Sequence, residues 1–274
     1  MTYKQGRYNL SATIFVPFDC DNNCPFCTSK ADYKNNEDFS LENVLDAIRL
    51  LNHKNEIKEF VITGGEPFAD IQGLKQIVNC CEKPVYINTT LPIKTFEQAK
   101  EIINSTDKIK GVNISRHIEY EFKNVASIEQ IDQIEKPVRI NCVIPNTYML
   151  KHNLLNFINK YGKKNRDINL RKDYTKTTKE NLKDFDSLFR WLATAFDYIE
   201  TESCMVCNTD YFSVEDKFIC AYHRGLQYSA VTVVGKCYVN DVIVSQNGNI
   251  YKDWNKTMDL DFLEWLQDND TKQP

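Results

Sequence analysis

Short apolar runs alternate with helical segments from residue 10 to about residue 196, and this alternation limits the possible folds more than any other feature. Repeated strand–helix units form a parallel sheet with right-handed crossovers. Six units predict an α/β fold, a partial (β/α)6 TIM-like barrel with its functional residues at the carboxyl ends of the strands. The predicted strands are Ala12–Phe18, Glu59–Thr63, Val85–Asn88, Val112–Ser115, Val138–Ile144 and Asp167–Arg171, and the predicted helices are 41–53, 71–81, 95–105, 126–134, 149–161 and 178–199.

The pattern changes after about residue 200, where cysteines cluster and helical periodicity fades. Hairpin-like runs cover Tyr211–Cys220 and Val239–Tyr251, and the second contains Asn247-Gly248, a dipeptide typical of tight turns. A last helix is predicted at 258–267. The sequence therefore predicts two domains, a barrel over residues 1–200 and a small cysteine-rich β/α appendage over residues 201–274.

The composition disfavours a general affinity for polyanions. The net charge is −4, so neither nucleic acid nor an anionic membrane is an expected partner. No secretory signal is visible, and no apolar stretch approaches the ~18 residues of a membrane span. We therefore expect a cytoplasmic protein without membrane contact. In that compartment the ten cysteines are more typical of metal ligands or buried thiols than of disulfides.

Cys20, Cys24 and Cys27 are close enough in sequence to hold one metal centre, but they are one ligand short of a closed site. Structural zinc takes four protein ligands, and each iron of a [4Fe–4S] cluster takes one. Three cysteines therefore favour a cluster with one iron open to a group that is not protein. A zinc site completed by a distant residue is the alternative.

The same run reads C-x3-C-x2-C, with Phe26 before the last cysteine, and it resembles the signature of the radical SAM superfamily. Thr63-Gly64-Gly65-Glu66-Pro67 follows the next predicted strand, as the Gly-Gly-Glu-Pro motif of that family does. The resemblance implies a [4Fe–4S] cluster whose open iron binds S-adenosylmethionine. An electron from the reduced cluster then cleaves the sulfonium to methionine and a 5′-deoxyadenosyl radical, which abstracts hydrogen from the substrate.

The resemblance also implies which residues contact S-adenosylmethionine. Gly64 and Gly65 would let the backbone approach the methionyl group, and Glu66 and Pro67 would complete the turn. For Glu66 the alternative is an acid at the start of a helix. The other implied cofactor-binding residues are Phe26, Asn88, Ser115, Asn141 and Arg171. For the four polar ones, the alternative is a side chain that caps a strand or bonds a loop.

A second candidate metal site comprises Cys204, Cys207, Cys220 and Cys237. A C-x2-C pair followed about a dozen residues later by a third cysteine resembles the auxiliary-cluster segments of radical SAM enzymes, of the twitch and SPASM types. The resemblance implies a second [4Fe–4S] cluster. Zinc bound by the same thiolates, or thiols that bind no metal, are the alternatives.

Taken together, these motifs predict a radical SAM enzyme, an oxidoreductase, transferase or lyase acting on a small molecule or peptide. Its partners would include an external reductant such as flavodoxin or ferredoxin. One alternative is a radical SAM enzyme with a C-terminal zinc site or no second metal. An alternative of another class is a non-catalytic iron–sulfur electron carrier or scaffold. No catalytic residue is predicted.

Overall fold

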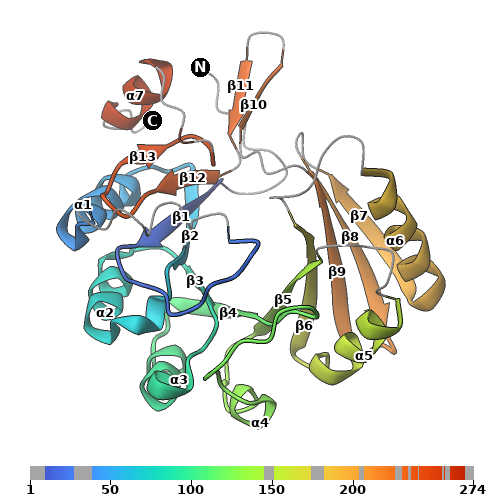
Figure 1. Cartoon of the computed structure of the whole chain (residues 1–274). Helices are drawn as coiled ribbons and strands as arrows, with labels where there is room; N and C mark the ends of the chain where they lie inside the picture. Colours follow the sequence, from blue (N-terminus) through green and yellow to red (C-terminus); the bar gives the residue numbers. More distant parts are fainter. Residues whose placement is uncertain are drawn as a thin grey trace.

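A curved eleven-stranded sheet with helices on its outer face forms the body of the protein (Figure 1). The strand order is β13-β12-β1-β2-β3-β4-β5-β6-β9-β8-β7. The computed structural model describes residues 10–27, 39–144, 151–173, 182–203, 207–225, 230–233, 236–239, 241–254, 256 and 260–268.

The six central strands are parallel, as the alternating pattern predicts, and each connection between them carries a helix on the outside of the sheet. The prediction of an α/β fold with a partial barrel is confirmed. The strands are β1 (Leu10–Val16), β2 (Ile57–Gly64), β3 (Val85–Thr89), β4 (Ile109–Ser115), β5 (Val138–Ile144) and β6 (Arg166–Lys172). The outer helices are α1 (Leu41–Asn52), α2 (Ile71–Cys80), α3 (Phe96–Ser105), α4 (Ile128–Ile131), α5 (Lys151–Tyr161) and α6 (Leu182–Ala195), and two 3₁₀ turns are η3 (Pro67–Ala69) and η4 (Ile93–Thr95).

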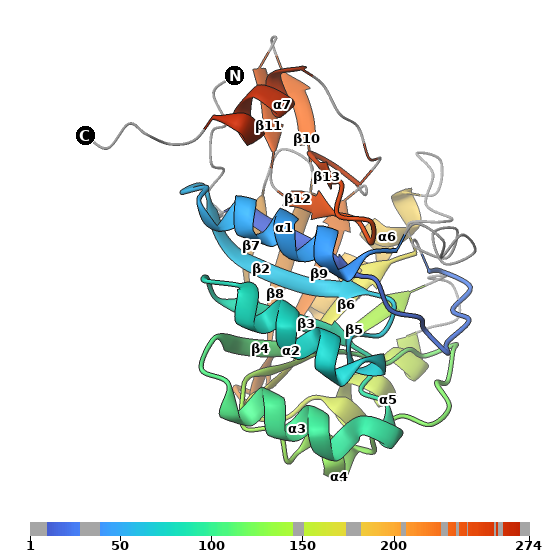
Figure 2. The same ribbon diagram turned by 90° about the vertical axis from the view of Figure 1, so that its left-hand side faces the viewer.

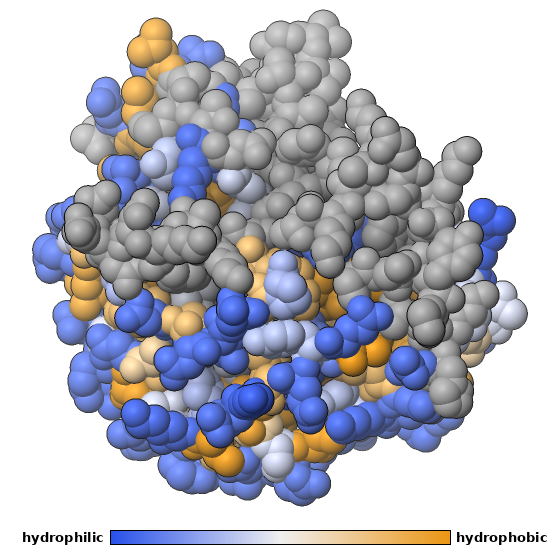
Figure 3. Space-filling model, viewed as in Figure 1, coloured by the Kyte–Doolittle hydropathy of each residue, from blue (hydrophilic) through white to orange (hydrophobic). Residues whose placement is uncertain are grey.

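The main core lies between the sheet and these helices. In β2, the side chains of Phe60 and Ile62 are buried beneath the helices, while the alternating residues Glu59 and Val61 face the inside of the arc and are only partly buried. Figure 2 shows α1, α2 and α3 stacked as one layer over the outer face. In Figure 3, the described residues in the lower part of the view are mainly hydrophilic, with small apolar patches between them.

Side chains cap the starts of several of the outer helices. The Ser40 hydroxyl accepts a hydrogen bond from the Asn43 N–H at the start of α1, and Asp70 accepts from the Gln72 and Gly73 N–H groups at the start of α2. The predicted helix at 126–134 is a single turn, α4, which has a capping box between Ser127 and Gln130.

Most of the strands after residue 196 extend the same sheet at both of its edges. The strands β7 (Asp197–Ser203), β8 (Cys207–Val214) and β9 (Phe218–Gly225) follow β6, while β12 (Asp241–Val244) and β13 (Ile250–Tyr251) lie beside β1. The strands β10 (Ala230–Val233) and β11 (Lys236–Val239) pair with each other. The helix α7 (Leu260–Gln267) comes last. The domain boundary at residue 200 stays a prediction.

Both predicted hairpins are present. The β8–β9 turn has Glu215 and Asp216 at positive φ, and the β12–β13 turn has Gly248 at φ +84°. The predicted helix over 178–199 is wrong at its end, because α6 stops at Ala195 and Asp197–Ser203 is a strand paired with β8. Tyr198, Ile199 and Thr201 have high strand propensity, and the antiparallel partner overrides the helical pattern.

Candidate functional site

The cysteine loop, residues 17–27, leaves the carboxyl end of β1. Cys20, Cys24 and Cys27 are all half-buried, and none is in a disulfide. The Cys27 N–H donates to the Cys24 carbonyl oxygen at 3.2 Å. Burial raises the pKa of the Cys20 thiol, and the charges of Glu66 and Cys27 raise it further. The loop therefore carries three thiols beside the turn that follows β2.

Thiolates are the ligands of iron–sulfur clusters, so this donor set suits the cluster that the motif implies. Within the described part of the chain, no three His, Cys, Asp or Glu side chains are arranged as ligands of a metal ion. The coordination of a cluster by these three cysteines therefore stays a prediction.

The Gly64-Gly65 turn is fitted against the cysteine loop. Gly64 has a φ of +117°, a conformation that favours glycine. A Cβ on Gly65 would lie 2.0 Å from the Phe18 carbonyl oxygen, far inside any permitted contact. The Glu66 N–H also donates to the Asp19 carbonyl oxygen at 3.2 Å. Glycine is thus required here by the close approach of two loops, independently of any cofactor.

The Glu66 carboxylate joins the ends of β2 and β3. It is 3% exposed and accepts hydrogen bonds from the Thr89 and Thr90 hydroxyls and from the Thr90 and Phe68 N–H groups, at 2.5 to 3.2 Å. Burial raises its pKa, and the bonds from the threonines oppose the shift. Both oxygens are therefore engaged within the chain, at the start of η3. A cofactor contact of Glu66 stays a prediction.

Thr90 connects this network to the cysteine loop. The Asn22 side-chain amide lies 3.4 Å from the Thr90 hydroxyl and 3.8 Å from the Cys20 sulfur. On the other side, the buried Arg116 guanidinium donates to the Thr90 carbonyl oxygen at 2.9 Å and to the Ala126 carbonyl oxygen at 2.7 Å. Burial lowers the pKa of Arg116 to about 10. Arg116 is thus a fixed cation that anchors the end of β3.

Phe26 packs into an aromatic cluster at the loop after β4. Its ring centroid lies 4.4 Å from that of His117 and 6.0 Å from that of Tyr120, and the Tyr120 hydroxyl accepts from the Asn23 N–H at 3.3 Å. His117 Nδ1 accepts from the Val143 N–H at 3.0 Å. Burial, and then the nearby Arg116, lower the pKa of His117 to about 3, so the ring is neutral near pH 7. The cysteine loop is thereby held from both sides.

The other predicted cofactor residues lie at neighbouring register positions of the parallel strands, on the inside of the arc. Asn88 pairs in register with Asn113, whose amide donates to the Asn88 side-chain oxygen at 2.7 Å. Ser115 is in register with Asn141, which accepts from Asn169 at 2.9 Å. These asparagines bond one another, so the structure brings them together as pairs. Their contact with a cofactor stays a prediction.

Several residues of this network have no motif of their own. Thr89, Thr90 and Asn113 are ordinary polar residues at strand ends, and only their position after the third and fourth strands marks them. The long-range contacts of Asn22 and Arg116 are not encoded in any local pattern.

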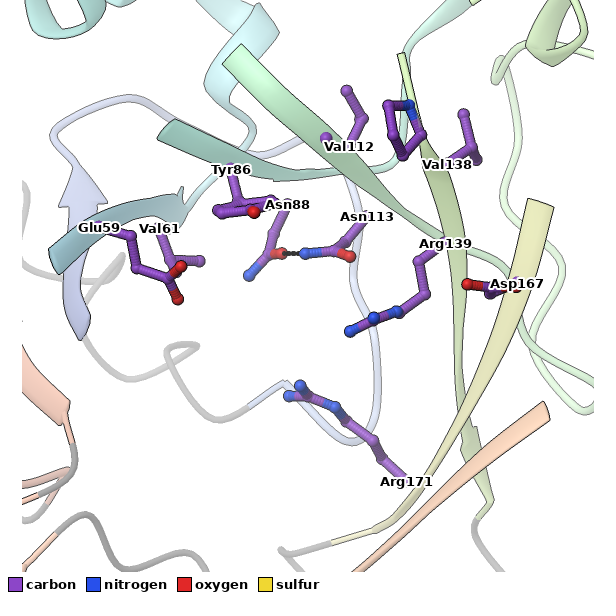
Figure 4. A pocket seen from close by; sticks show the side chains of 12 residues that line it. Glu59, Val61, Tyr86, Asn88, Val112, Asn113, Val138, Arg139, Asp167 and Arg171 are labelled. Atoms are coloured by element: carbon purple, nitrogen blue, oxygen red, sulfur yellow. Dashed lines mark hydrogen bonds between the residues drawn. The ribbon is translucent and has the colours of Figure 1, made fainter. Parts of the chain in front are cut away.

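A cavity of about 410 Å³ opens inside the arc (Figure 4). Its polar lining comes from β2 to β6, with Glu59 on one wall and Arg139 and Arg171 on the opposite one (Figure 4). The polar lining residues are Glu59, Tyr86, Asn88, Asn113, Arg139, Asp167 and Arg171. Of the predicted cofactor residues, Asn88 and Arg171 line this cavity.

The C-terminal cysteines are not gathered together as far as the structure describes them. Cys204 lies outside the described residues, as do the side chains of Cys207 and Cys237. The backbone of Cys207 pairs with Gly225, whereas Cys220 pairs with Phe212, five positions further along β8. That offset is about 17 Å at the rise of a strand. Cys220 is fully buried in the apolar core, which raises its pKa.

The family model described as the radical SAM superfamily matches residues 14–192, a segment that contains the cysteine loop, the Gly64–Pro67 turn, the end of β1 and all of β2 to β6. No curated protein matches the chain. Among the described residues, no helix has both the length and the apolar character needed to cross a membrane.

Proposed function

Because the chain belongs to the radical SAM superfamily, we propose that it is an enzyme that abstracts hydrogen from a small-molecule or peptide substrate. Membership supports reductive cleavage of S-adenosylmethionine at an iron–sulfur cluster. Members of the family also use an external reductant, and a flavodoxin or ferredoxin would suit that role. The reaction class and the substrate belong to the proposal, as does a cytoplasmic location.

The observation that carries the proposal is the attachment of the cysteine loop to the Gly64–Pro67 turn. The two motifs are about forty residues apart in sequence, yet Gly65 lies against Phe18, and Glu66 bonds to Asp19. In a parallel barrel, this carboxyl end of the strands is where active sites lie. A cluster held by Cys20, Cys24 and Cys27 would therefore stand at the mouth of the barrel.

Residues of the chain would position the cluster at the mouth of the barrel and shield it from solvent. When bound, the cluster supplies the electron that cleaves the sulfonium of S-adenosylmethionine. Phe26 and its aromatic neighbours hold one side of the loop, and the Glu66–Thr90 network holds the other. Asn88, Ser115, Asn141 and Arg171, inside the arc, are the proposed contacts of S-adenosylmethionine. Phe26, Gly64, Gly65, Glu66 and Pro67 complete the proposed set.

The position of Cys220 favours a radical SAM enzyme in which this residue is not a ligand of a second cluster. A buried thiol in an apolar core acts as a small hydrophobic side chain. A second cluster at Cys204, Cys207 and Cys237 remains part of the proposal. Iron analysis separates the two possibilities, because one cluster gives about four irons per chain and two give about eight.

The test is 5′-deoxyadenosine formation from S-adenosylmethionine by anaerobically reconstituted, dithionite-reduced protein. We expect the wild type to form it, and Cys24→Ala to lose both the product and the iron of one cluster. Cys80→Ala is the matched control, since Cys80 is also a half-buried thiol but lies at the end of α2. Reconstituted wild-type protein that carries iron but forms no 5′-deoxyadenosine would instead support an electron carrier or scaffold.

A further inference from the structure

The cavity inside the arc extends from the amino-terminal halves of the strands toward their carboxyl ends. Glu59 is the third residue of β2, Tyr86 the second of β3 and Asp167 the second of β6, so the lining comes largely from the amino-terminal halves of the strands. The cysteine loop follows the carboxyl end of β1. A ligand in the cavity would therefore have one end deep in the barrel and the other end toward the loop.

Two guanidinium groups enter this cavity from neighbouring strands. Arg139 is the second residue of β5 and Arg171 the sixth of β6, and Figure 4 shows both side chains extending into the same space. Among the described residues, neither guanidinium has a hydrogen bond or an ion pair. Arg139 stands directly opposite Asp167 in the strand register, but no ion pair joins them. Both arginines are exposed to the open cavity, whereas the buried Arg166 is paired with Asp132 and the half-buried Arg224 with Asp210.

The acids of the cavity have other partners or lie elsewhere. Asp167 accepts a hydrogen bond from the Ile219 N–H at 2.9 Å, and Glu59 accepts from the Ser11 hydroxyl at 3.0 Å on the opposite wall. Within the described residues, the β5–β6 wall thus carries two positive charges without an ion pair, and Arg171 also interacts electrostatically with the buried Asp241 of β12. The charge distribution would orient a polar ligand with its negative end toward that wall.

We propose that Arg139 and Arg171 bind an anionic group, a carboxylate or a phosphate, of a small-molecule substrate inside the barrel, which assigns Arg171 to the substrate in place of the S-adenosylmethionine contact that the family resemblance implies for it. Guanidinium forks match the planar or tetrahedral oxygens of these groups and form bidentate, charge-assisted hydrogen bonds with them. Asn88 and Asn113, whose amides are hydrogen-bonded to each other, line an adjoining wall of the same cavity. A volume of about 410 Å³ is within the range of small-molecule sites.

This inference rests on the proposed function, because it takes the ligand to be the substrate. It also narrows that function from a small molecule or peptide to a small acid. The anion would fix one end of the substrate deep in the barrel, and the reacting carbon would lie nearer the cysteine loop. Specificity for the acid would then reside in Arg139, a residue with no place in the family motifs.

The test measures anion binding rather than turnover. Inorganic phosphate and succinate are titrated separately into the reconstituted full-length protein by calorimetry. S-adenosylmethionine is present in both titrations, so that binding of a probe at the position of its carboxylate cannot account for the result. We expect one of the two probes to bind to the wild type, and the identity of that probe distinguishes a phosphate from a carboxylate. Arg139→Gln should weaken that binding about tenfold or more, because a charge-assisted bidentate contact is lost.

Arg49→Gln is the matched control. Arg49 is an exposed arginine on α1, paired with Glu42 and Asp46, and its substitution should leave the affinity unchanged. Failure of the wild type to bind either probe, or equal affinity in Arg139→Gln, would overturn the proposal.

A second measurement uses the wild type alone, so it does not depend on the folding of a variant. Phenylglyoxal modifies accessible arginines, and mass spectrometry of the peptides reports each site. The bound anion should protect Arg139 and Arg171 and leave Arg49 reactive; equal modification with and without the anion would count against the site. Wild-type protein that forms 5′-deoxyadenosine but binds no anion would refute only this inference, whereas the reverse result would refute only the proposed function.

Discussion

Replacement of Glu66 by glutamine tests whether this residue has a structural task that needs no cofactor. Each carboxylate oxygen accepts one backbone N–H and one threonine hydroxyl: Phe68 and Thr89 on one, Thr90 twice on the other. Glutamine keeps the shape but turns one acceptor into a donor. A threonine hydroxyl can rotate to accept from the new NH₂ group, but a backbone N–H cannot. In either orientation of the amide, one buried N–H therefore loses its partner.

The expected cost follows from that single loss. A buried donor without an acceptor costs about 1–3 kcal/mol. Removal of a buried negative charge offsets part of this, because burial already raises the pKa of Glu66 and so disfavours the ionised form. We therefore expect Glu66→Gln to lower the free energy of unfolding by about 1–2 kcal/mol, toward the lower end of that range.

Urea unfolding of the metal-free protein at pH 7, without S-adenosylmethionine, measures this free energy with no contribution from a cofactor. Glu97→Gln on α3 is the control, since Glu97 is 75% exposed and its loss should change stability by less than about 0.5 kcal/mol. If Glu66→Gln unfolds at the wild-type urea concentration, the four hydrogen bonds do not stabilise the fold. The carboxylate would then be free for the cofactor contact that the family motif implies.

Two further outcomes are expected. Gly65→Ala would place a Cβ 2.0 Å from the Phe18 carbonyl oxygen, so we expect a loss of about 1–3 kcal/mol in urea unfolding together with reduced iron uptake on reconstitution. Gly111→Ala, whose nearest neighbour would be at 3.2 Å, should cost less, and equal losses would contradict the close approach of the two loops. The pKa of His117 is lowered to about 3 in the folded protein, against an ordinary value of 6.5, so its contribution to stability is complete above pH 6.5 and is lost as the pH falls toward 3. At pH 5 this loss is about 2 kcal/mol. His117→Asn places an oxygen close to the position of Nδ1, so it can still accept the Val143 N–H but does not titrate. Its unfolding free energy should therefore fall less between pH 7.5 and 5, and an unchanged slope would show that His117 is not the group responsible.

The sequence predicts those features of the structure that depend on residues close together along the chain. The strand–helix alternation predicts all six parallel strands, and the two short motifs identify the cysteine loop and the turn beside it. The turn residues Glu215-Asp216 and Gly248 likewise mark their hairpins, because a positive φ is a local property of the chain.

Contacts between distant residues are not predictable in this way. Nothing near Glu66 in sequence indicates that Thr90 satisfies its carboxylate, and nothing near Phe26 indicates that His117 packs against it. The same reason explains the error over residues 196–199, where the periodicity continues the helix but pairing with β8 makes a strand. The pairing partner, rather than the segment itself, decides that structure.

The parallel pairing of β1 with β12 has a consequence for how the protein is made. β1 is synthesised near the start of the chain, but one of its two neighbours begins at Asp241, and Thr13 bonds to a carboxylate 228 residues away. Pairings of such long sequence separation form slowly, because a large loop must close first. On the ribosome, the strand that precedes the cysteines therefore keeps an open edge until residues 241–244 have emerged. The sheet beneath the cysteine loop is consequently completed only after all six parallel strands have been synthesised.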